Sequence, residues 1–121
     1  MYITVILCLL FLTSLILVVL NNRKKTQQIV EKIKGGALLI DVRTQEEYKE
    51  GAIEGSIHIP LQEITQKISK LDPDQYYLTY CSHGVRSIKA LKILRRRGVK
   101  HVYNGGSMSK LQKLIDEKNR A

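Results

Sequence analysis

The residue whose surroundings most favour chemistry is Cys81. It follows a short apolar strand expected over residues 76–80, and the loop after it leads into a helix expected from Ser87 to Arg97. Backbone N–H groups in such a loop, and in the first turn of the helix, can converge on the sulfur and on an anion bonded to it. Their field lowers the pKa of the thiol, and the thiolate is the nucleophilic form. We therefore predict that Cys81 is catalytic.

The loop after Cys81 is predicted to bind the substrate. Its five residues are Ser82, His83, Gly84, Val85 and Arg86. Gly84 permits a turn with positive φ that curls the backbone around the sulfur. Arg86 adds a side-chain donor, and His83 is either a further donor or a plain surface residue. The alternative interpretation of Cys81 is a buried, inert thiol, which the glycine, the arginine and the following helix together disfavour.

Asp41 and Arg43 form a second pair of interest, near the C-terminal end of the first predicted strand. We expect a local hydrogen-bonded pair that supports the edge of the sheet and takes no part in catalysis. His58 and His101 are interpreted as structural or solvated. The two cysteines and three histidines of the chain lack the spacing of metal ligands, so neither a metal site nor a cofactor is predicted.

A phosphatase or arsenate reductase is an alternative class, because these enzymes also hold an oxyanion over a cysteine. Phosphatase loops place the arginine one position further from the cysteine than Arg86 lies from Cys81. In this chain Ser87 occupies that position. The shorter loop encloses a smaller ring of N–H donors, which suits a single sulfur atom better than a tetrahedral phosphate. The spacing therefore disfavours a phosphatase.

Alternating strand and helix patterns position the loop. Short apolar segments predict strands over residues 37–42, 56–60, 76–80 and 100–103. Periodic segments predict helices over residues 26–34, 45–50, 61–71, 87–97 and 108–115, and Thr44 is expected to cap the second of them. This alternation predicts an α/β fold with a mainly parallel sheet and helices on both faces. The reactive crevice of such sheets lies beyond the C-terminal strand ends, where Cys81 is expected.

The run from Tyr2 to Leu20 has no charged side chain and is long enough to cross a bilayer as a helix. It lacks the basic start and the small residues of a cleaved signal peptide, so a retained transmembrane helix is expected. Arg23, Lys24 and Lys25 follow directly, which predicts a single-pass protein of the cell membrane with its C-terminal domain in the cytoplasm. The predicted organisation is a transmembrane helix over residues 1–22, a basic linker and first helix over 23–34, and a globular domain over 35–121.

The formal net charge of +9 belongs to the part after the apolar run, since no Lys, Arg, Asp or Glu precedes Arg23. A short tether after Leu20 would hold this basic domain near the bilayer, so contact with anionic lipid is a further prediction. Residues 86–100 carry seven basic and no acidic side chains, which either attract anionic substrates, dock on the membrane or are merely solvated. Tryptophan is absent and the tyrosines are not interleaved with basic residues, so no nucleic acid partner is expected.

Three segments of the chain resemble the single-domain rhodaneses. They are Asp41-Val42-Arg43 with Glu46-Glu47-Tyr48, the segment 51–61, and the loop 80–87. Gly105-Gly106 also fits, and the resemblance spans about residues 33–114. It implies an open sheet of about five strands. Ala52, where the family usually has histidine, and Lys110, near the place of a frequent aromatic residue, depart from its pattern.

The same resemblance implies a sulfurtransferase without a cofactor. Cys81 would take a sulfane sulfur from a donor such as thiosulfate, hold it as a persulfide, and pass it to cyanide or a cellular thiol. A different class of function is an interaction module or persulfide carrier, tethered to the membrane, that turns over no small molecule. The sequence leaves the physiological donor, the acceptor and any protein partner open.

Overall fold

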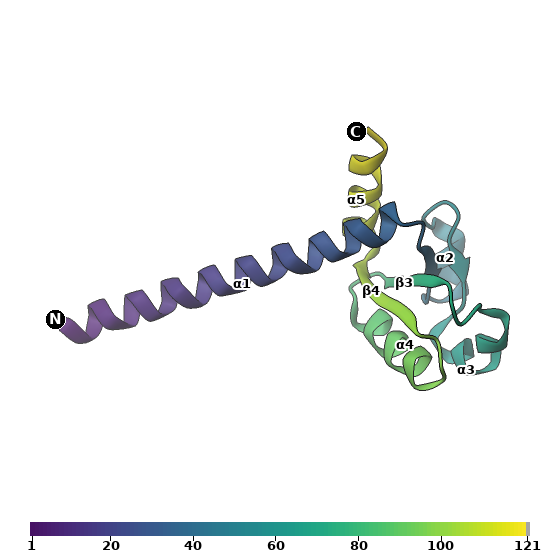
Figure 1. Ribbon diagram of the computed structural model, residues 1–121, viewed down its shortest axis with the longest axis horizontal. Helices are drawn as coiled ribbons and strands as arrows, with labels where there is room; N and C mark the ends of the chain where they lie inside the picture. Colours follow the sequence, from purple (N-terminus) through teal and green to yellow (C-terminus); the bar gives the residue numbers. More distant parts are fainter. Residues whose placement is uncertain (121) are drawn as a thin grey trace.

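A parallel sheet lies at the centre of the domain that follows the long N-terminal helix (Figure 1). The structure is a computed structural model and describes residues 1–120. Four strands pair in the order β2-β1-β3-β4, every pair parallel. Their bounds are Leu38–Asp41 for β1, Ile57–His58 for β2, Tyr76–Cys81 for β3 and His101–Ser107 for β4.

The count of four strands corrects the expected five. The apolar segments of the sequence account for four strands, and only the family resemblance implied a fifth. The residues up to Lys34, which could have supplied an additional edge strand, are helical, and Ile29 and Ile33 near the end of this helix pack on one face of the sheet. The last strand is longer than expected, because it continues through Gly105 and Gly106 and pairs Cys81 with Ser107 beyond an irregularity at Thr79/Tyr80.

Helices cover both faces of the sheet, as predicted. One face carries α4 (Val85–Arg96) and α3 (Ile64–Lys67), which is flanked by the 3-10 turns η1 (Leu61–Glu63) and η2 (Ile68–Lys70). The other face carries α5 (Met108–Arg120) and the end of α1 (Tyr2–Lys34). The single helix expected over residues 61–71 is thus broken into three short pieces, although its apolar side chains still pack on the core.

Helix α1 runs without interruption from Tyr2 to Lys34, so the tether expected after Leu20 is helical. Residues 21–28 contain neither glycine nor proline, so nothing in them interrupts the helix. The helix ends only before Gly35. The apolar part projects away from the domain (Figure 1) and is long and apolar enough to cross a membrane. In its last turns, Ile29 and Ile33 pack on the sheet.

The direction of α1 decides which end of the sheet lies nearest the apolar run. Lys25 lines one groove together with Gly106, near the C-terminal end of β4. Seven residues later, the Lys32 Nζ lies 4.9 Å from the ring centroid of Tyr76, the first residue of β3. The C-terminal ends of the strands therefore face the apolar part of α1.

Candidate active site

Cys81 ends β3 and is buried, with 1% of its surface exposed. The backbone N–H of Gly84 donates to its Sγ at 2.9 Å. Gly84 adopts φ +91°, in the left-handed region that favours glycine, and α4 begins at the next residue. The tight curl expected around the sulfur is therefore present.

The environment of Cys81 favours the thiolate. Burial raises the pKa of the thiol, but hydrogen bonds from the backbone and hydroxyl of Ser87 and from the backbone of His83 and Gly84 lower it more. The net effect is a pKa below the ordinary value of 9.0. A larger fraction of the sulfur is therefore ionised near neutral pH than in a free cysteine.

A buried polar network supports the loop from below. The Ser87 hydroxyl lies 2.8 Å from the Gly84 carbonyl oxygen and 2.7 Å from Asn104 Oδ1, and these two oxygens compete with the Cys81 sulfur for its single proton. The Gly106 N–H donates to the same Oδ1 at 2.9 Å, and the Thr79 hydroxyl donates to the Ser87 carbonyl oxygen at 3.0 Å. These bonds join the first turn of α4 to β3 and β4, so the curl around the sulfur is held by both strands.

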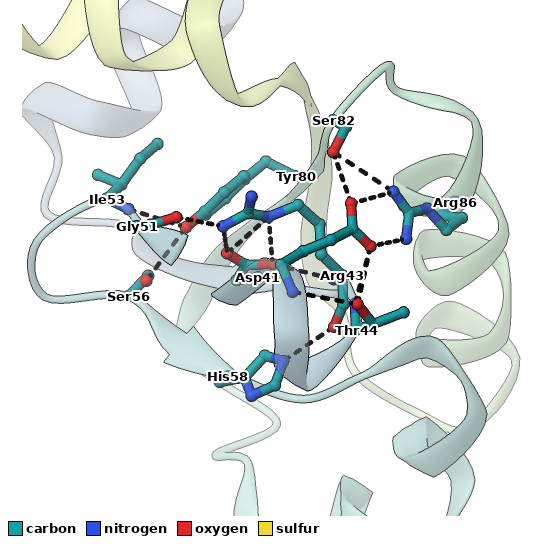
Figure 2. Close-up of polar contacts among 11 residues, drawn as sticks. Asp41, Arg43, Thr44, Gly51, Ile53, Ser56, His58, Tyr80, Ser82 and Arg86 are labelled. Atoms are coloured by element: carbon teal, nitrogen blue, oxygen red, sulfur yellow. Dashed lines mark hydrogen bonds and ion pairs between the residues drawn. The ribbon is translucent and has the colours of Figure 1, made fainter. Parts of the chain in front are cut away.

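The side chain of Arg86 forms a bidentate ion pair with Glu47. Figure 2 draws this pair as the dashed lines from Arg86 to a carboxylate that carries no label. Its two terminal nitrogens donate to the Glu47 oxygens at 2.6 and 2.9 Å. The Ser82 hydroxyl donates to the same carboxylate at 2.8 Å. The guanidinium of Arg86 therefore closes the loop against α2 (Gln45–Glu50), and none of the hydrogen bonds of the described residues joins it to the Cys81 sulfur.

Glu47 also completes the predicted cap of α2. The Thr44 hydroxyl accepts a hydrogen bond from the Glu47 N–H, and the Glu47 carboxylate accepts one from the Thr44 N–H at 3.2 Å. The bonds from Arg86, opposed by burial and aided by those from Ser82 and Thr44, hold the pKa of this carboxyl well below its usual range. Glu47 is thus ionised across the neutral range and links the start of α2 to the cysteine loop.

Asp41 and Arg43 form the predicted ion pair, buried at the end of β1 (Figure 2). The Arg43 Nη2 lies 2.8 Å from Asp41 Oδ2 and also donates to the Gly51 carbonyl oxygen at 2.7 Å. The bond to Asp41, opposed by burial, raises the pKa of the guanidinium. The pair bridges the end of β1 to the end of α2 and makes no contact with Cys81 among the hydrogen bonds of the described residues.

Three aromatic side chains hold the same region in place. The buried Tyr80 hydroxyl accepts from the Ile53 N–H at 3.1 Å and donates to Ser56 Oγ at 3.2 Å, and burial raises its pKa to about 12. His58 stacks on Tyr48 with a centroid distance of 4.2 Å, and its Nε2 lies 2.8 Å from the Arg43 carbonyl oxygen. His58 is thus structural, as interpreted from the sequence.

The predicted site residues lie together in one loop, although their side chains point in different directions. His83 is exposed, Val85 is 63% exposed, and Gly84 is buried behind them. Within residues 1–120 no cluster of three or more His, Cys, Asp or Glu side chains could hold a metal ion.

Three residues that support the loop were missed by sequence reasoning: Glu47, Ser87 and Asn104. The spacing of Thr44 and Glu47 is a capping-box signal that could have marked Glu47, but its partner Arg86 lies 39 residues away. Ser87 and Asn104 carry no comparable local signal.

Comparison with known proteins agrees with this geometry. The sequence profile of the rhodanese-like domain matches residues 24–114. The chain is 39% identical over 85 residues to the "Putative sulfurtransferase YtwF" of Bacillus subtilis, covering 69% of this chain and 82% of that protein. It is 38% identical over 71 residues to the thiosulfate sulfurtransferase PspE of Escherichia coli, covering 57% and 68% of the two chains.

The fold matches a solved structure described as a rhodanese with anions from E. coli. The TM-score is 0.58 and the sequence identity 34%, over 61% of this chain and 89% of that one. The parallel α/β sheet, the cysteine loop before α4 and the profile match over residues 24–114 agree with one another. The chain belongs to the rhodanese-like domain family.

Proposed function

We propose that this protein is a sulfurtransferase that carries sulfane sulfur on Cys81 as a persulfide, with a donor such as thiosulfate. The observation that carries the proposal is the Cys81 thiol at the end of β3, which receives the Gly84 N–H at 2.9 Å and has a lowered pKa. The relatives that are named as sulfurtransferases support the reaction class.

The proposed reaction has two displacement steps. The Cys81 thiolate attacks the outer sulfur of thiosulfate, a Cys–S–S bond forms, and the bond to the inner sulfur breaks as sulfite leaves with the electron pair. Cyanide or a thiolate acceptor then attacks the terminal sulfur, and the electron pair of the S–S bond returns to Cys81. Cys81 is a thiolate before the first step and after the second, so the protein itself ends unchanged.

The loop would act by stabilising negative charge on the terminal sulfur of the persulfide. The Gly84 amide donates to the buried Cys81 sulfur, and hydrogen bonds to an anion in such a place are stronger than in water. Ser82 to Arg86 would form the wall of this pocket, and the bond from Arg86 to Glu47 would keep that wall in place. Asp41 and Arg43 would support the sheet edge without touching the substrate.

We further propose that residues 2–20 of α1 cross the cell membrane and that the domain lies in the cytoplasm. Support comes from the exposed apolar surface of this part of α1 and from Arg23, Lys24 and Lys25 directly after it. Extraction of membranes with alkaline carbonate should leave the protein in the membrane fraction. A protease added to sealed right-side-out vesicles should leave the domain intact and should digest it once the vesicles are opened.

The activity test compares the full chain, purified in neutral detergent, with Cys81→Ser and with Cys8→Ser. Thiocyanate formed from thiosulfate and cyanide should fall by at least 100-fold in Cys81→Ser, because the nucleophile is lost. Cys8→Ser is the matched control, since Cys8 is an exposed thiol of the apolar run, and it should retain full activity.

The mass of the sulfur adduct on Cys81 distinguishes an enzyme from a persulfide carrier. A gain of about one sulfur mass on Cys81 without thiocyanate formation would favour the persulfide carrier over the enzyme. Full activity in Cys81→Ser would contradict both.

A further inference from the structure

The hydroxyl of Ser87 has one proton and more acceptors around it than that proton can serve. Its oxygen lies 2.7 Å from Asn104 Oδ1 and 2.8 Å from the Gly84 carbonyl oxygen. The same hydroxyl reaches the Cys81 sulfur, where its hydrogen bond lowers the pKa of the thiol. Ser87 and Cys81 are buried, with 0% and 1% of their surfaces exposed, so bulk water does not replace this donor. A hydroxyl donates one hydrogen bond, and the three acceptors therefore compete for it.

The side-chain amide of Asn104 is held with its oxygen toward Ser87. The Gly106 N–H donates to the same Oδ1 at 2.9 Å. A flipped amide would set its NH₂ group against this backbone N–H, and two donors cannot bond to each other. Asn104 thus presents an acceptor to Ser87, and not a donor.

The strength of the Cys81 sulfur as an acceptor depends on its charge. A thiol sulfur is a weak acceptor, so an amide oxygen competes well with it for a hydroxyl proton. A thiolate is an anion, and hydrogen bonds to an ion are about twice as strong as those between neutral groups. The preferred acceptor of the Ser87 proton therefore changes when Cys81 ionises.

We propose that Asn104 is a positioning residue for Cys81, which holds the Ser87 proton while the sulfur is protonated and gives it up when the sulfur ionises. The inference rests on the proposed function, in which the Cys81 thiolate attacks the donor and is formed again in the second step. Asn104 acts on the sulfur through Ser87 alone. Its bond to Ser87 is made beside the thiol and lost beside the thiolate, so Asn104 opposes ionisation of Cys81. Without it the thiolate is more stable, and a thiolate of lower pKa is a weaker nucleophile.

Charged and titratable side chains approach the cysteine loop from several elements. They are His83 in the loop, Arg86 of α4, Glu47 of α2, Asp41 and Arg43 at the end of β1, and Lys25 of α1, which lines a groove with Asn104. Residues 102–107 of β4 carry no Asp, Glu, Lys, Arg or His, and η1 and α3 add apolar side chains to the cluster around Cys81. The tyrosines at positions 80 and 103 pack on the opposite face of the sheet. Asn104→Ala changes none of these charges, so a shift in Cys81 ionisation must come from the hydrogen bonds.

The first test follows the pH dependence of Cys81 alkylation by iodoacetamide, with the full chain in neutral detergent and a Cys8→Ser background. Asn104→Ala removes one competing acceptor, so the midpoint should fall by about half a pH unit. Asn104→Asp keeps the oxygen that accepts from Gly106 and Ser87 and makes it a stronger acceptor, so the midpoint should rise. An unchanged or raised midpoint in Asn104→Ala would overturn the proposal. If loss of the Gly106 bond prevents folding of that variant, an unchanged or lowered midpoint in Asn104→Asp would overturn it equally.

The second test repeats Asn104→Ala in a Ser87→Ala background. With no hydroxyl proton left to share, the midpoint should move by less than about 0.2 pH unit between the single and the double variant. A shift as large as that seen with Ser87 present would show that Asn104 acts by another route, which contradicts the proposal. Alkylation needs no sulfur donor, so its outcome is independent of thiocyanate formation, which reports on the proposed function.

Discussion

At the scale of single residues, the site depends on a cysteine whose charge is set by its neighbours. The place of Cys81 at the end of a strand, the glycine that curls its loop and the pair Asp41–Arg43 could be predicted, because each belongs to a contiguous pattern in the sequence. The contacts of Ser87 with Asn104 and of Arg86 with Glu47 could not, since they join residues 17 and 39 positions apart. Such contacts arise only when the strands have been brought side by side.

Ser87→Ala is expected to raise the pKa of Cys81, because it removes a hydroxyl that lowers it. The sign follows from the thiolate: a lowered pKa keeps Cys81 ionised at pH values below 9.0, and a raised pKa returns the proton there. The rate of alkylation by iodoacetamide should rise with pH as a titration curve with one midpoint. That midpoint should move to higher pH in the variant. Measurements in a Cys8→Ser background restrict the signal to Cys81, and an unchanged midpoint would contradict the role given to Ser87.

At the scale of elements, the sequence predicted the strands well and the helices less well. The four apolar segments are all strands of the sheet, since burial between two helical layers demands continuous apolar sequence. The segment 61–71 has helical spacing of its apolar residues, yet it folds as η1, α3 and η2, which serve to bury Ile64 and Leu71 against the core. Spacing alone cannot tell a regular helix from a chain of short turns with the same buried side.

Gly105→Ala tests how tightly β4 packs on its neighbours. A Cβ built at Gly105 would lie 2.8 Å from the Thr79 carbonyl oxygen and 3.0 Å from the Leu111 Cδ2, so strand and helix must both move. We expect a loss of about 1 to 3 kcal/mol in the free energy of unfolding, measured by urea titration of the full chain in detergent with circular dichroism. Gly35→Ala is the control: Gly35 has φ −76° and its nearest contact would be 3.4 Å away, so this variant should be as stable as the parent. Equal stability of the two variants would contradict the packing described here.

At the scale of the whole molecule, one continuous helix joins the apolar run to the sheet. The sequence predicted the apolar run and the amphipathic end of this helix as separate pieces, because the polar residues 21–28 lie between them. Lys32 lies over Tyr76 and Tyr103 at 4.9 and 4.6 Å, and Ile29 and Ile33 pack beneath, so the end of α1 is fixed on the sheet. The orientation of the domain is therefore coupled to that of α1.

With α1 inserted as proposed, this coupling predicts which end of the domain lies nearer to the membrane. In nanodiscs with a spin label on the lipid headgroup, the amide signal of Gly84 should be broadened more than that of Gly36, which lies next to the start of β1 at the opposite end. The two glycines serve as internal controls for each other in one sample. Equal broadening would indicate that the domain tumbles freely on its helix, and stronger broadening at Gly36 would reverse the orientation.

The absence of a hinge in α1 would restrict which molecules can reach the sulfur, once α1 is inserted as proposed. Lys25, about 8 Å along the helix from Leu20, lines a groove together with Gly106, so the strand ends would lie directly at the headgroups. A folded domain, about 30 Å across, would be too large to enter between them, whereas thiosulfate or an extended peptide bearing a thiol could approach from the side. Access to Cys81 would thereby favour small solutes and thiols that travel in the plane of the membrane.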